Sequence, residues 1–180
     1  LVSKAGSAAQ RNALLPGLVD GKRKMAFAYL EPGLRYEIAP SKTSAKADGA
    51  GWVLDGEKTV VIGAPVADTL IVSARTSGQA GEAAGVSLFI VDAKAAGVTM
   101  SPNRTVDGQR AADVRFKGVK LGADALLGAK DQAIPHIEEA LDFATALLCA
   151  DAIGTMKNAN DATLEYIKTR KQFGVAIGSF

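Results

Sequence analysis

Cysteine and histidine are almost absent from this sequence: Cys149 and His136 are the sole representatives among 180 residues. A single cysteine excludes an internal disulfide and fits a reducing compartment. We interpret Cys149, in an apolar helical run, as a small buried hydrophobe. A zinc site would need mainly carboxylate ligands, and a nucleophile with a histidine base would depend on His136 alone. We therefore expect no metal site, and we interpret His136 as a surface or capping residue where a helix begins.

The sequence also lacks a dominant charge and a long apolar run. Its 21 basic and 19 acidic residues leave a formal net charge of +2, and the basic residues are scattered, which argues against a nucleic-acid-binding surface. No apolar segment approaches the roughly 18 residues that a membrane-spanning helix needs, and no basic-then-apolar leader opens the chain. We expect a cytoplasmic protein without a nucleic-acid or membrane partner.

Glycine motifs that bind phosphate are missing as well. In Gly17-Leu-Val-Asp-Gly21-Lys22 three residues separate the glycines where a P-loop has four, and no Gly-x-Gly-x-x-Gly follows a predicted strand. The sequence is 48% hydrophobic and 22% charged, a composition typical of a globular domain. The chain starts at Leu1 without a methionine and stops at Phe180 in a run without a stop signal, so we expect a piece of a longer protein.

Alternating apolar and polar residues predict a series of short strands in the first two thirds of the chain. Asp55-Gly56 separates two strand-like runs within 52–62, and this dipeptide favours a hairpin turn because such turns need positive φ. Gly63-Ala-Pro65 ends the second run, and a third run covers Thr69 to Arg75. Seven or so strands without intervening helices predict an antiparallel barrel or sandwich. The further strands are expected over 24–30, 42–48 (turned by Gly49-Ala-Gly51), 86–91, 98–100 and 112–116.

Helical patterns flank these strands. A short one covers Ser7 to Leu15 and is expected to end at Pro16-Gly17. A long one runs from Asp131, a candidate N-cap, to Arg170, with apolar residues at helical spacing. A helix of that length is about 58 Å long, more than one small β-domain covers. We expect its apolar stripes to need partner helices that this chain lacks.

The segment Leu54-Asp-Gly-Glu-Lys-Thr-Val-Val-Ile-Gly-Ala-Pro-Val-Ala-Asp68 resembles the middle domain of the FAD-dependent acyl-CoA dehydrogenases. The family pattern is L-x-G-x-K-x-(W/F)-I-(T/S)-x-(G/A)-x-x-A-D, and the bacterial branch with pimeloyl-CoA dehydrogenase small subunits is the most similar. Further matches lie before this segment, at 26–32, and after it, at 166–174, in the same order as in the family. The resemblance implies an α+β protein in three parts. These are the end of an N-terminal helical domain (1–20), an antiparallel β-barrel or sandwich (21–128) and one long helix that starts an incomplete C-terminal helical bundle (129–180).

The resemblance implies that FAD is the cofactor. In the family, a strand ending in Glu-Pro and the strand after the hairpin lie against the isoalloxazine ring. The positions that match are Phe27, Tyr29, Leu30, Glu31, Val60, Val61 and Ile62. Leu30 stands in place of the family's usual Thr, Val60 in place of its Trp or Phe, and Ile62 in place of its Thr. We therefore expect backbone contact with the flavin and no hydrogen bonds from side-chain hydroxyls. Without the resemblance, these apolar residues would equally be barrel core.

The motif Arg170-Lys-Gln-Phe-Gly174 matches an Arg-x-x-Phe-Gly that, in the family, reaches the FAD pyrophosphate bound by a neighbouring subunit. The resemblance therefore implies cofactor binding by Arg170, Gln172 and Phe173. The planar guanidinium suits phosphate because it donates two parallel hydrogen bonds. The alternative is a helix C-terminus where the dipole favours cations and Gly174 is the cap.

The resemblance also places the acyl-CoA substrate. Asp142-Phe-Ala-Thr145 falls where many members carry Asp-x-x-Arg near the thioester, and Tyr36 lies where the usual motif is Gly-Ser-Asp. Tyr36, Asp142 and Thr145 are therefore expected to bind substrate. The catalytic base is expected beyond Phe180, because the minority position for it on the long helix is Ala144, so no catalytic residue is assigned.

The implied function is that of a fragment of an acyl-CoA dehydrogenase, an oxidoreductase of fatty acid metabolism. It would form the α,β double bond of an acyl-CoA thioester with hydride transfer to flavin N5. The implied partners are acyl-CoA, an electron-transferring flavoprotein and further subunits in a homo- or hetero-oligomer, a tetramer. Two alternatives stay open, a non-catalytic subunit of a heteromeric dehydrogenase and a flavin monooxygenase on the same scaffold.

Overall fold

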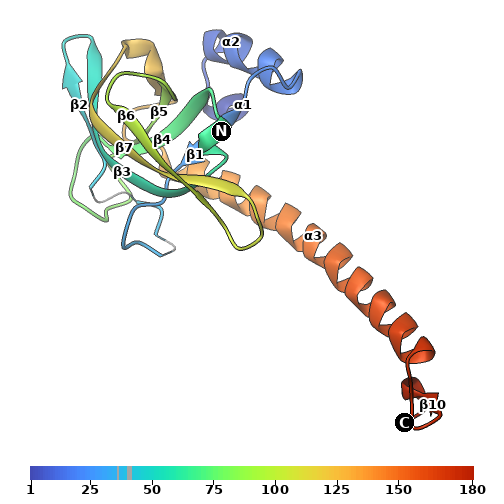
Figure 1. The fold of residues 1–180 in the computed structure, drawn as a ribbon. Helices are drawn as coiled ribbons and strands as arrows, with labels where there is room; N and C mark the ends of the chain where they lie inside the picture. The colour runs from blue at the N-terminus through green and yellow to red at the C-terminus, as the bar shows by residue number, and fades with distance from the viewer. Residues whose placement is uncertain (36, 40–41) are drawn as a thin grey trace. The chain divides into compact units, whose positions relative to one another are not determined.

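The computed structural model describes residues 1–35, 37–39 and 42–180, and Figure 1 shows its fold. The chain divides into two compact units, Leu1–Glu138 and Glu139–Phe180. The first unit contains the helices α1 (Val2–Ala5) and α2 (Ala8–Val19) and a mixed sheet. The second contains most of α3 (Ile134–Thr169) and a short hairpin.

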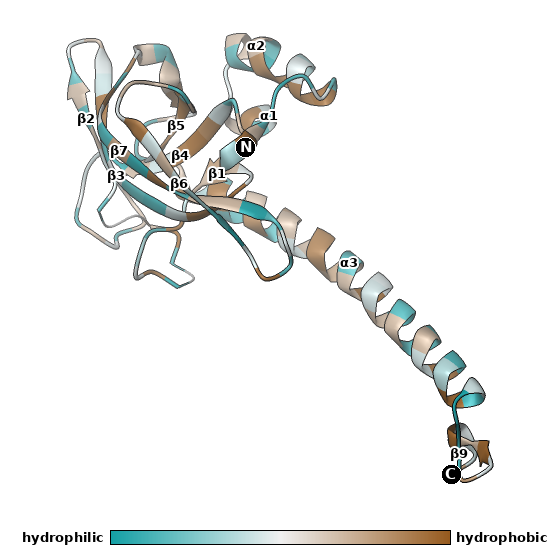
Figure 2. Ribbon diagram, in the orientation of Figure 1, coloured by the Kyte–Doolittle hydropathy of each residue, from teal (hydrophilic) through white to brown (hydrophobic). Residues whose placement is uncertain are grey.

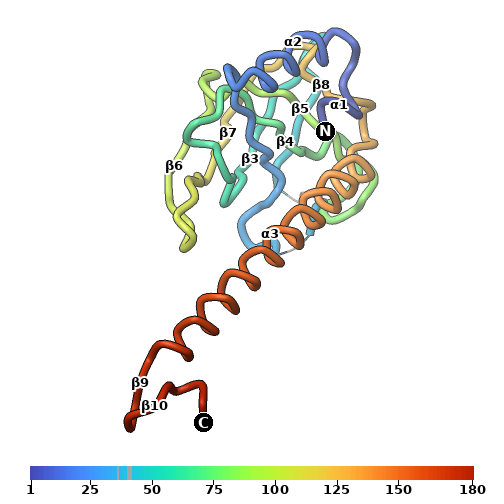
Figure 3. Tube along the Cα trace, turned by 90° about the vertical axis from the view of Figure 1, so that its right-hand side faces the viewer, coloured from blue at the N-terminus to red at the C-terminus, as the bar shows by residue number. Residues whose placement is uncertain are grey.

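The first unit is built on an eight-stranded sheet. Its strands run in the order β6-β7-β3-β2-β4-β5-β8, with β1 beside β4, and Figure 3 shows β6 and β8 at opposite ends of the row. The described pairings between named strands are antiparallel except β1 with β4 and a single residue pair between β2 and β4. The strands are β1 (Met25–Ala28), β2 (Ser44–Asp48), β3 (Gly51–Ile62), β4 (Thr69–Arg75), β5 (Val86–Asp92), β6 (Val98–Arg104), β7 (Arg110–Leu121) and β8 (Leu126–Leu127).

The α+β class with a mostly antiparallel sheet is therefore confirmed. The finer prediction of a barrel or sandwich is not confirmed, because the described strands of the first unit form one sheet with β6 and β8 as unjoined ends. Single turns of 3₁₀ helix, η1 (Ala64–Val66) and η2 (Ala123–Ala125), connect strands, and a third, η3 (Ile177–Ser179), lies near the end of the chain.

The core lies against the centre of the sheet, where Figure 2 shows apolar segments. All seven residues of β4 are buried, including the polar Thr69, Ser73 and Arg75, so both faces of this strand are covered. Leu54 of β3 and Phe89 of β5 are fully buried, and Trp52 packs edge-on against Phe89 with ring centroids 5.3 Å apart. The predicted run at Thr69–Arg75 is confirmed to the residue.

The prediction of a hairpin turn at Asp55-Gly56 is wrong. β3 continues through both residues, and the turn lies at Gly49-Ala50, where Asp48 of β2 pairs with Gly51 of β3. Gly56 is required for a different reason: a Cβ there would lie 2.5 Å from the Thr43 Cα. The Asp-Gly pair thus marks a close backbone approach inside a strand, which glycine also permits.

Strands β6 and β7 extend well beyond their predicted ranges, 98–100 and 112–116. The added residues of β6 include Ser101 to Arg104, all exposed. The end of β6 buries neither of its faces, although its β7 partners Ala111 and Ala112 are buried, so the alternation that predicts a strand is absent from β6 there.

The first helix also extends beyond its prediction. Ser7 and Gln10 form a reciprocal capping box at its start, but α2 continues past Pro16-Gly17 to Val19. The prediction that Pro16 ends the helix is wrong. Proline removes one hydrogen bond from the ladder, and α2 tolerates this loss near its C-terminal end.

The helix α3 spans 36 residues and has Pro135 in its first turn, where a proline removes no intrahelical hydrogen bond. Asp131 is not its N-cap, because the helix begins three residues later and the Asp131 carboxylate accepts a hydrogen bond from the Thr76 hydroxyl (2.6 Å). Cys149 is exposed, so the prediction of a buried cysteine is wrong for this chain. Apolar residues recur along α3 (Figure 2). The large exposed ones are Phe143, Leu147, Leu148, Ile153, Met156, Leu164 and Tyr166.

In the part of the chain that the structure describes, no helix is both long and apolar enough to cross a membrane. The same residues contain no group of three or more metal-ligating side chains. His136 lies in the first turn of α3 and is half-buried.

Candidate flavin-binding site

The end of β1 and the end of β3 lie side by side in the first unit. The Thr59 N–H donates to the Leu30 carbonyl oxygen (3.0 Å), which ties the two segments together. On β1 the small side chains of Ala26 and Ala28 point into the core. Because side chains alternate along a strand, Phe27 lies on the opposite face. The sequence-predicted residues of these two segments are therefore brought together.

Aromatic rings cover the outward face of the first segment. Phe27 and Tyr29 are stacked, with centroids 4.9 Å apart and planes 24° from parallel, and both are half-buried. Neither ring belongs to the buried core cluster. Such a pair is a flat apolar surface with one polar edge, the Tyr29 hydroxyl.

The end of β3 adds two exposed aliphatic side chains. Val60 is 42% exposed and Ile62 45%, whereas Val61 between them is 2% exposed and packs in the core. Apolar residues with this exposure on a strand end form a small uncovered surface. A contact between Val61 and a cofactor would have to use its backbone, while Val60 and Ile62 present side chains.

A β-bulge produces this arrangement. Lys58 of β3 pairs with Val114 of β7, and Val61 of β3 pairs with Ala112 of β7. Between these two pairs β3 advances by three residues and β7 by only two, so β3 carries one extra residue. Lys58 and Val61 both face inward although they are three positions apart. The extra residue reverses the inside-outside alternation after Lys58 and turns Val60 outward.

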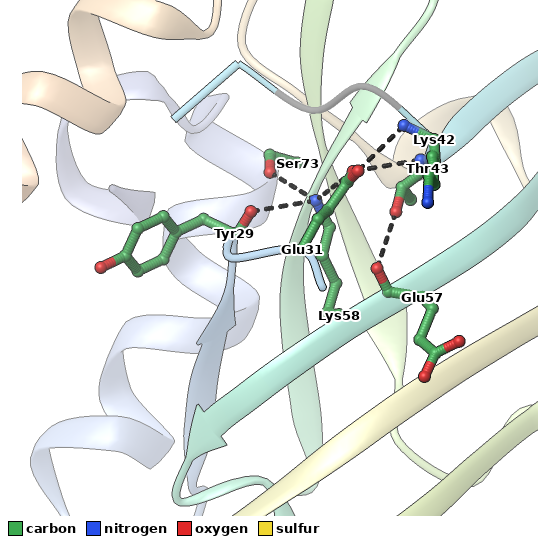
Figure 4. A network of polar contacts seen from close by, with 7 residues as sticks. All are labelled: Tyr29, Glu31, Lys42, Thr43, Glu57, Lys58 and Ser73. Atoms are coloured by element: carbon green, nitrogen blue, oxygen red, sulfur yellow. Dashed lines mark hydrogen bonds and ion pairs between the residues drawn. The ribbon is translucent and has the colours of Figure 1, made fainter. Parts of the chain in front are cut away.

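Glu31, predicted to contact the cofactor, is buried in a polar network shown in Figure 4. Its carboxylate accepts hydrogen bonds from the backbone N–H groups of Lys42 (2.9 Å) and Thr43 (3.0 Å) and pairs with the Lys58 ammonium (3.2 Å). Lys58 also donates to the Tyr29 carbonyl oxygen and the Ser73 hydroxyl, both at 3.1 Å. The network fixes the loop after β1 onto β3.

Both charges of this pair are perturbed. Burial alone would raise the pKa of Glu31, but the charge of Lys58 and the N–H groups of Lys42 and Thr43 outweigh it and lower that pKa below the ordinary value. Burial lowers the pKa of Lys58 to about 8 against the opposing attraction of Glu31. The Glu31 carboxylate is thus an ionised internal anchor.

The geometry of this site suits a flavin, as follows from its apolar side chains and its backbone hydrogen bonds. The stacked rings and the two exposed aliphatic side chains fit the face of a flat ring system. The Tyr29 and Leu30 carbonyl oxygens and the Val60 N–H already have partners inside the protein. The residues fit an isoalloxazine ring as apolar cover. Behind that cover Glu31 was found from the sequence but not its anchoring role, and its partners Lys58 and Ser73 were not found. A signal for one of them was available, since Lys58 is a charged residue in phase with the buried Leu54.

Two of the three predicted substrate residues lie on α3. Tyr36 lies outside the described residues. Asp142 and Thr145 are exposed on α3 in the second unit, and the Thr145 hydroxyl donates to the Leu141 carbonyl oxygen one turn earlier (2.8 Å).

The predicted phosphate motif forms a hairpin in the second unit. Arg170 follows α3 directly, and β9 (Lys171–Gln172) pairs with β10 (Val175–Ala176). Phe173, with φ +50°, and Gly174, with φ +84°, make the turn. Gly174 is therefore not a helix cap, because α3 ends at Thr169. The turn leaves Phe173 95% exposed.

The first unit thus combines a mostly antiparallel sheet with an exposed apolar surface at Val60 and Ile62 and a buried ion pair between Glu31 and Lys58. The model of the acyl-CoA dehydrogenase middle domain matches residues 26–119. The chain is 32% identical to acyl-CoA dehydrogenase FadE12 of Mycobacterium bovis over 99% of its own length and 47% of that relative. The chain belongs to the acyl-CoA dehydrogenase family.

Two further proteins are similar. The caffeyl-CoA reductase-Etf complex subunit CarC of Acetobacterium woodii is 32% identical over 98% of the chain and 47% of its own length. The structure of a glutaryl-CoA dehydrogenase of Mycobacterium smegmatis in complex with FADH2 is 25% identical, with a TM-score of 0.89, over 99% of this chain and 45% of its own. The chain spans about half the length of the curated relatives it matches.

Proposed function

We propose that the chain is part of an FAD-dependent acyl-CoA dehydrogenase that forms the α,β double bond of an acyl-CoA thioester. The observation that carries the proposal is the match over nearly the whole chain to relatives of that name, together with the uncovered apolar face at the ends of β1 and β3. In this proposal residues 1–20 end an N-terminal helical domain, residues 21–128 are the middle β-domain, and residues 129–180 begin a C-terminal helical domain.

FAD, when bound, would supply the acceptor for the hydride that leaves the substrate. The roles of this chain's residues are to bind and to exclude water. Val60 and Ile62 cover one part of the ring, and Phe27 and Tyr29 lie beside it. Excluding water from this surface strengthens any polar contact the ring makes elsewhere.

The remaining assignments follow the family. Leu30, Glu31 and Val61 approach the cofactor by backbone only. Arg170, Gln172 and Phe173 bind the pyrophosphate of FAD held by a neighbouring subunit. Tyr36, Asp142 and Thr145 line the acyl-CoA path, and the base that removes the α-proton lies outside this chain.

The proposed partners are an electron-transferring flavoprotein and further subunits of the same oligomer, in the cytoplasm. The name of the relative from Acetobacterium woodii, a subunit of an Etf complex, supports the first. The exposed apolar side chains of α3 support the second, because uncovered apolar surface of this kind favours association.

The test uses the intact protein. We expect it to bind FAD with a yellow absorbance spectrum and to be bleached anaerobically by a saturated acyl-CoA. A protein that stays colourless after reconstitution with FAD would exclude the dehydrogenase and favour a non-catalytic subunit. Oxygen consumption by the reduced flavin without bleaching by acyl-CoA would favour a monooxygenase.

A further inference from the structure

Two breaks in the pairing of β3 with β7 share one construction. At the first break the extra residue is on β7, and the Gly118 N–H donates to the carboxylate of Asp55 on β3 (2.7 Å). At the second the extra residue is on β3, and the Val60 N–H donates to the carboxylate of Asp113 on β7 (3.0 Å). In each case an aspartate on the regular strand binds the N–H of the bulged strand.

The residue at the two bulges differs. Gly118 has φ +59° and Val60 has φ +49°, so both are in the left-handed region. Glycine adopts that conformation without steric cost, whereas a β-branched residue is strained in it. The strained conformation of Val60 therefore needs a stabilising contact. Asp113 Oδ1 accepts a hydrogen bond from the Val60 N–H and a second one from the hydroxyl of the neighbouring Thr59 (2.6 Å).

The conformation of Val60 decides which side chains face outward. Lys58 faces the interior, and a regular strand would then place Val60 and Ile62 inside and Val61 outside. The bulge does the reverse: Val61 is 2% exposed while Val60 and Ile62 are 42% and 45% exposed. The surface proposed to cover the flavin exists because this one residue is bulged.

We propose that Asp113 is a positioning residue that holds Val60 in the left-handed conformation and so presents Val60 and Ile62 to the flavin. The inference rests on the proposed function for the identity of the ligand. It assigns Asp113 no contact with the cofactor. The Thr59 hydroxyl and the Val60 N–H lower the pKa of Asp113 below its ordinary value, because both donate to the ionised carboxylate.

The first measurement compares FAD binding of intact variants by fluorescence titration. Asp113→Ala should weaken FAD binding at least tenfold. Asp113→Asn should stay within about threefold of wild type, because the amide oxygen still accepts from both donors. Asp55→Ala is the matched control, since it removes the aspartate of the other bulge, and should leave FAD affinity unchanged. Equal affinities of Asp113→Ala and Asp55→Ala would overturn the inference.

The second measurement needs no FAD and separates this inference from the proposed function. Asp113→Ala is made in the wild type and in Val60→Gly, and the melting temperatures of the cofactor-free proteins are compared. Glycine adopts the left-handed conformation unaided, so Asp113→Ala should lower the melting temperature less in the Val60→Gly background. An equal fall in both would overturn the role of Asp113. A wild type that binds no FAD would refute the proposed function, and the same comparison would still decide what Asp113 does.

Discussion

At the scale of single residues, Glu31 and Lys58 determine how the loop after β1 meets β3. Both side chains are completely buried, and removing one partner of such a pair leaves an unpaired charge in the interior. The sequence motif placed Glu31 at the cofactor, but its hydrogen bonds point to the backbone of Lys42 and Thr43. Sequence alone could not distinguish these roles, because Lys58 is 27 residues away and only the fold pairs them.

Lys58→Met should be strongly destabilising. It leaves the Glu31 charge buried without its partner, a change that costs about 3–5 kcal/mol. The double variant Glu31→Gln with Lys58→Met removes both charges and should be the milder change. Thermal melting of the intact protein measures both, and a single variant as stable as the double variant would show that the pair carries no such penalty.

The stability of the protein should depend on pH through Glu31. Its pKa is lowered in the folded state from 4.5, so the unfolded chain binds more protons as the pH falls. The contribution is complete above pH 4.5 and is lost as the pH falls through the folded pKa. The measurement is the melting temperature between pH 7 and pH 3, in which Glu31→Gln should show a shallower acid decline than wild type. Parallel curves would exclude Glu31 as a source of acid sensitivity.

At the scale of elements, the sequence predicted the strands that alternate and missed the features that interrupt alternation. Thr69–Arg75, which does not alternate, was identified as a strand-like run after the break at Gly63-Ala-Pro65, and the structure buries it on both faces. The bulge at Val60 could not be predicted, because valine is a poor residue for positive φ and no local pattern signals it. The Asp55-Gly56 pair has the composition of a turn, and only the approach of Thr43 shows why glycine is needed there.

Gly56→Ala should destabilise the protein more than Gly49→Ala. Gly49, in the hairpin turn, has φ +58° and no atom within 4 Å of a built Cβ, so alanine meets only backbone strain, about 1–2 kcal/mol. At Gly56, with φ +143°, the Cβ would also lie 2.5 Å from the Thr43 Cα. Overpacking of that kind adds about 1–3 kcal/mol. Equal melting temperatures of the two variants would show that Thr43 moves aside freely.

At the scale of the whole molecule, the resemblance supplied what the residues alone could not. The family, and with it the expectation of FAD, came from ordered motifs spread over the chain, and the middle-domain match at residues 26–119 confirms the family. The helix α3 was predicted from its periodicity. Its exposed apolar side chains favour association with further helices, in agreement with the proposed oligomer.

The proposed contact of Arg170 reaches beyond its own chain, because its proposed ligand is an FAD pyrophosphate held by a neighbouring subunit. Arg170 and Lys171 are adjacent, exposed and of equal charge, so the pair provides its own control. Losing a charge-assisted phosphate contact costs about 1.5–3 kcal/mol, equivalent to about a ten- to hundredfold weaker binding of FAD.

Arg170→Ala in the intact protein should therefore show that weakening by fluorescence titration, and Lys171→Ala should bind FAD nearly as wild type does. If Arg170 served only as a favourable cation at the end of α3, its loss would cost about 0.3–1 kcal/mol of stability and leave FAD affinity unchanged. Equal FAD affinities of the two variants would exclude the phosphate contact. A stability loss confined to Arg170→Ala would then identify the residue as a helix-end cation.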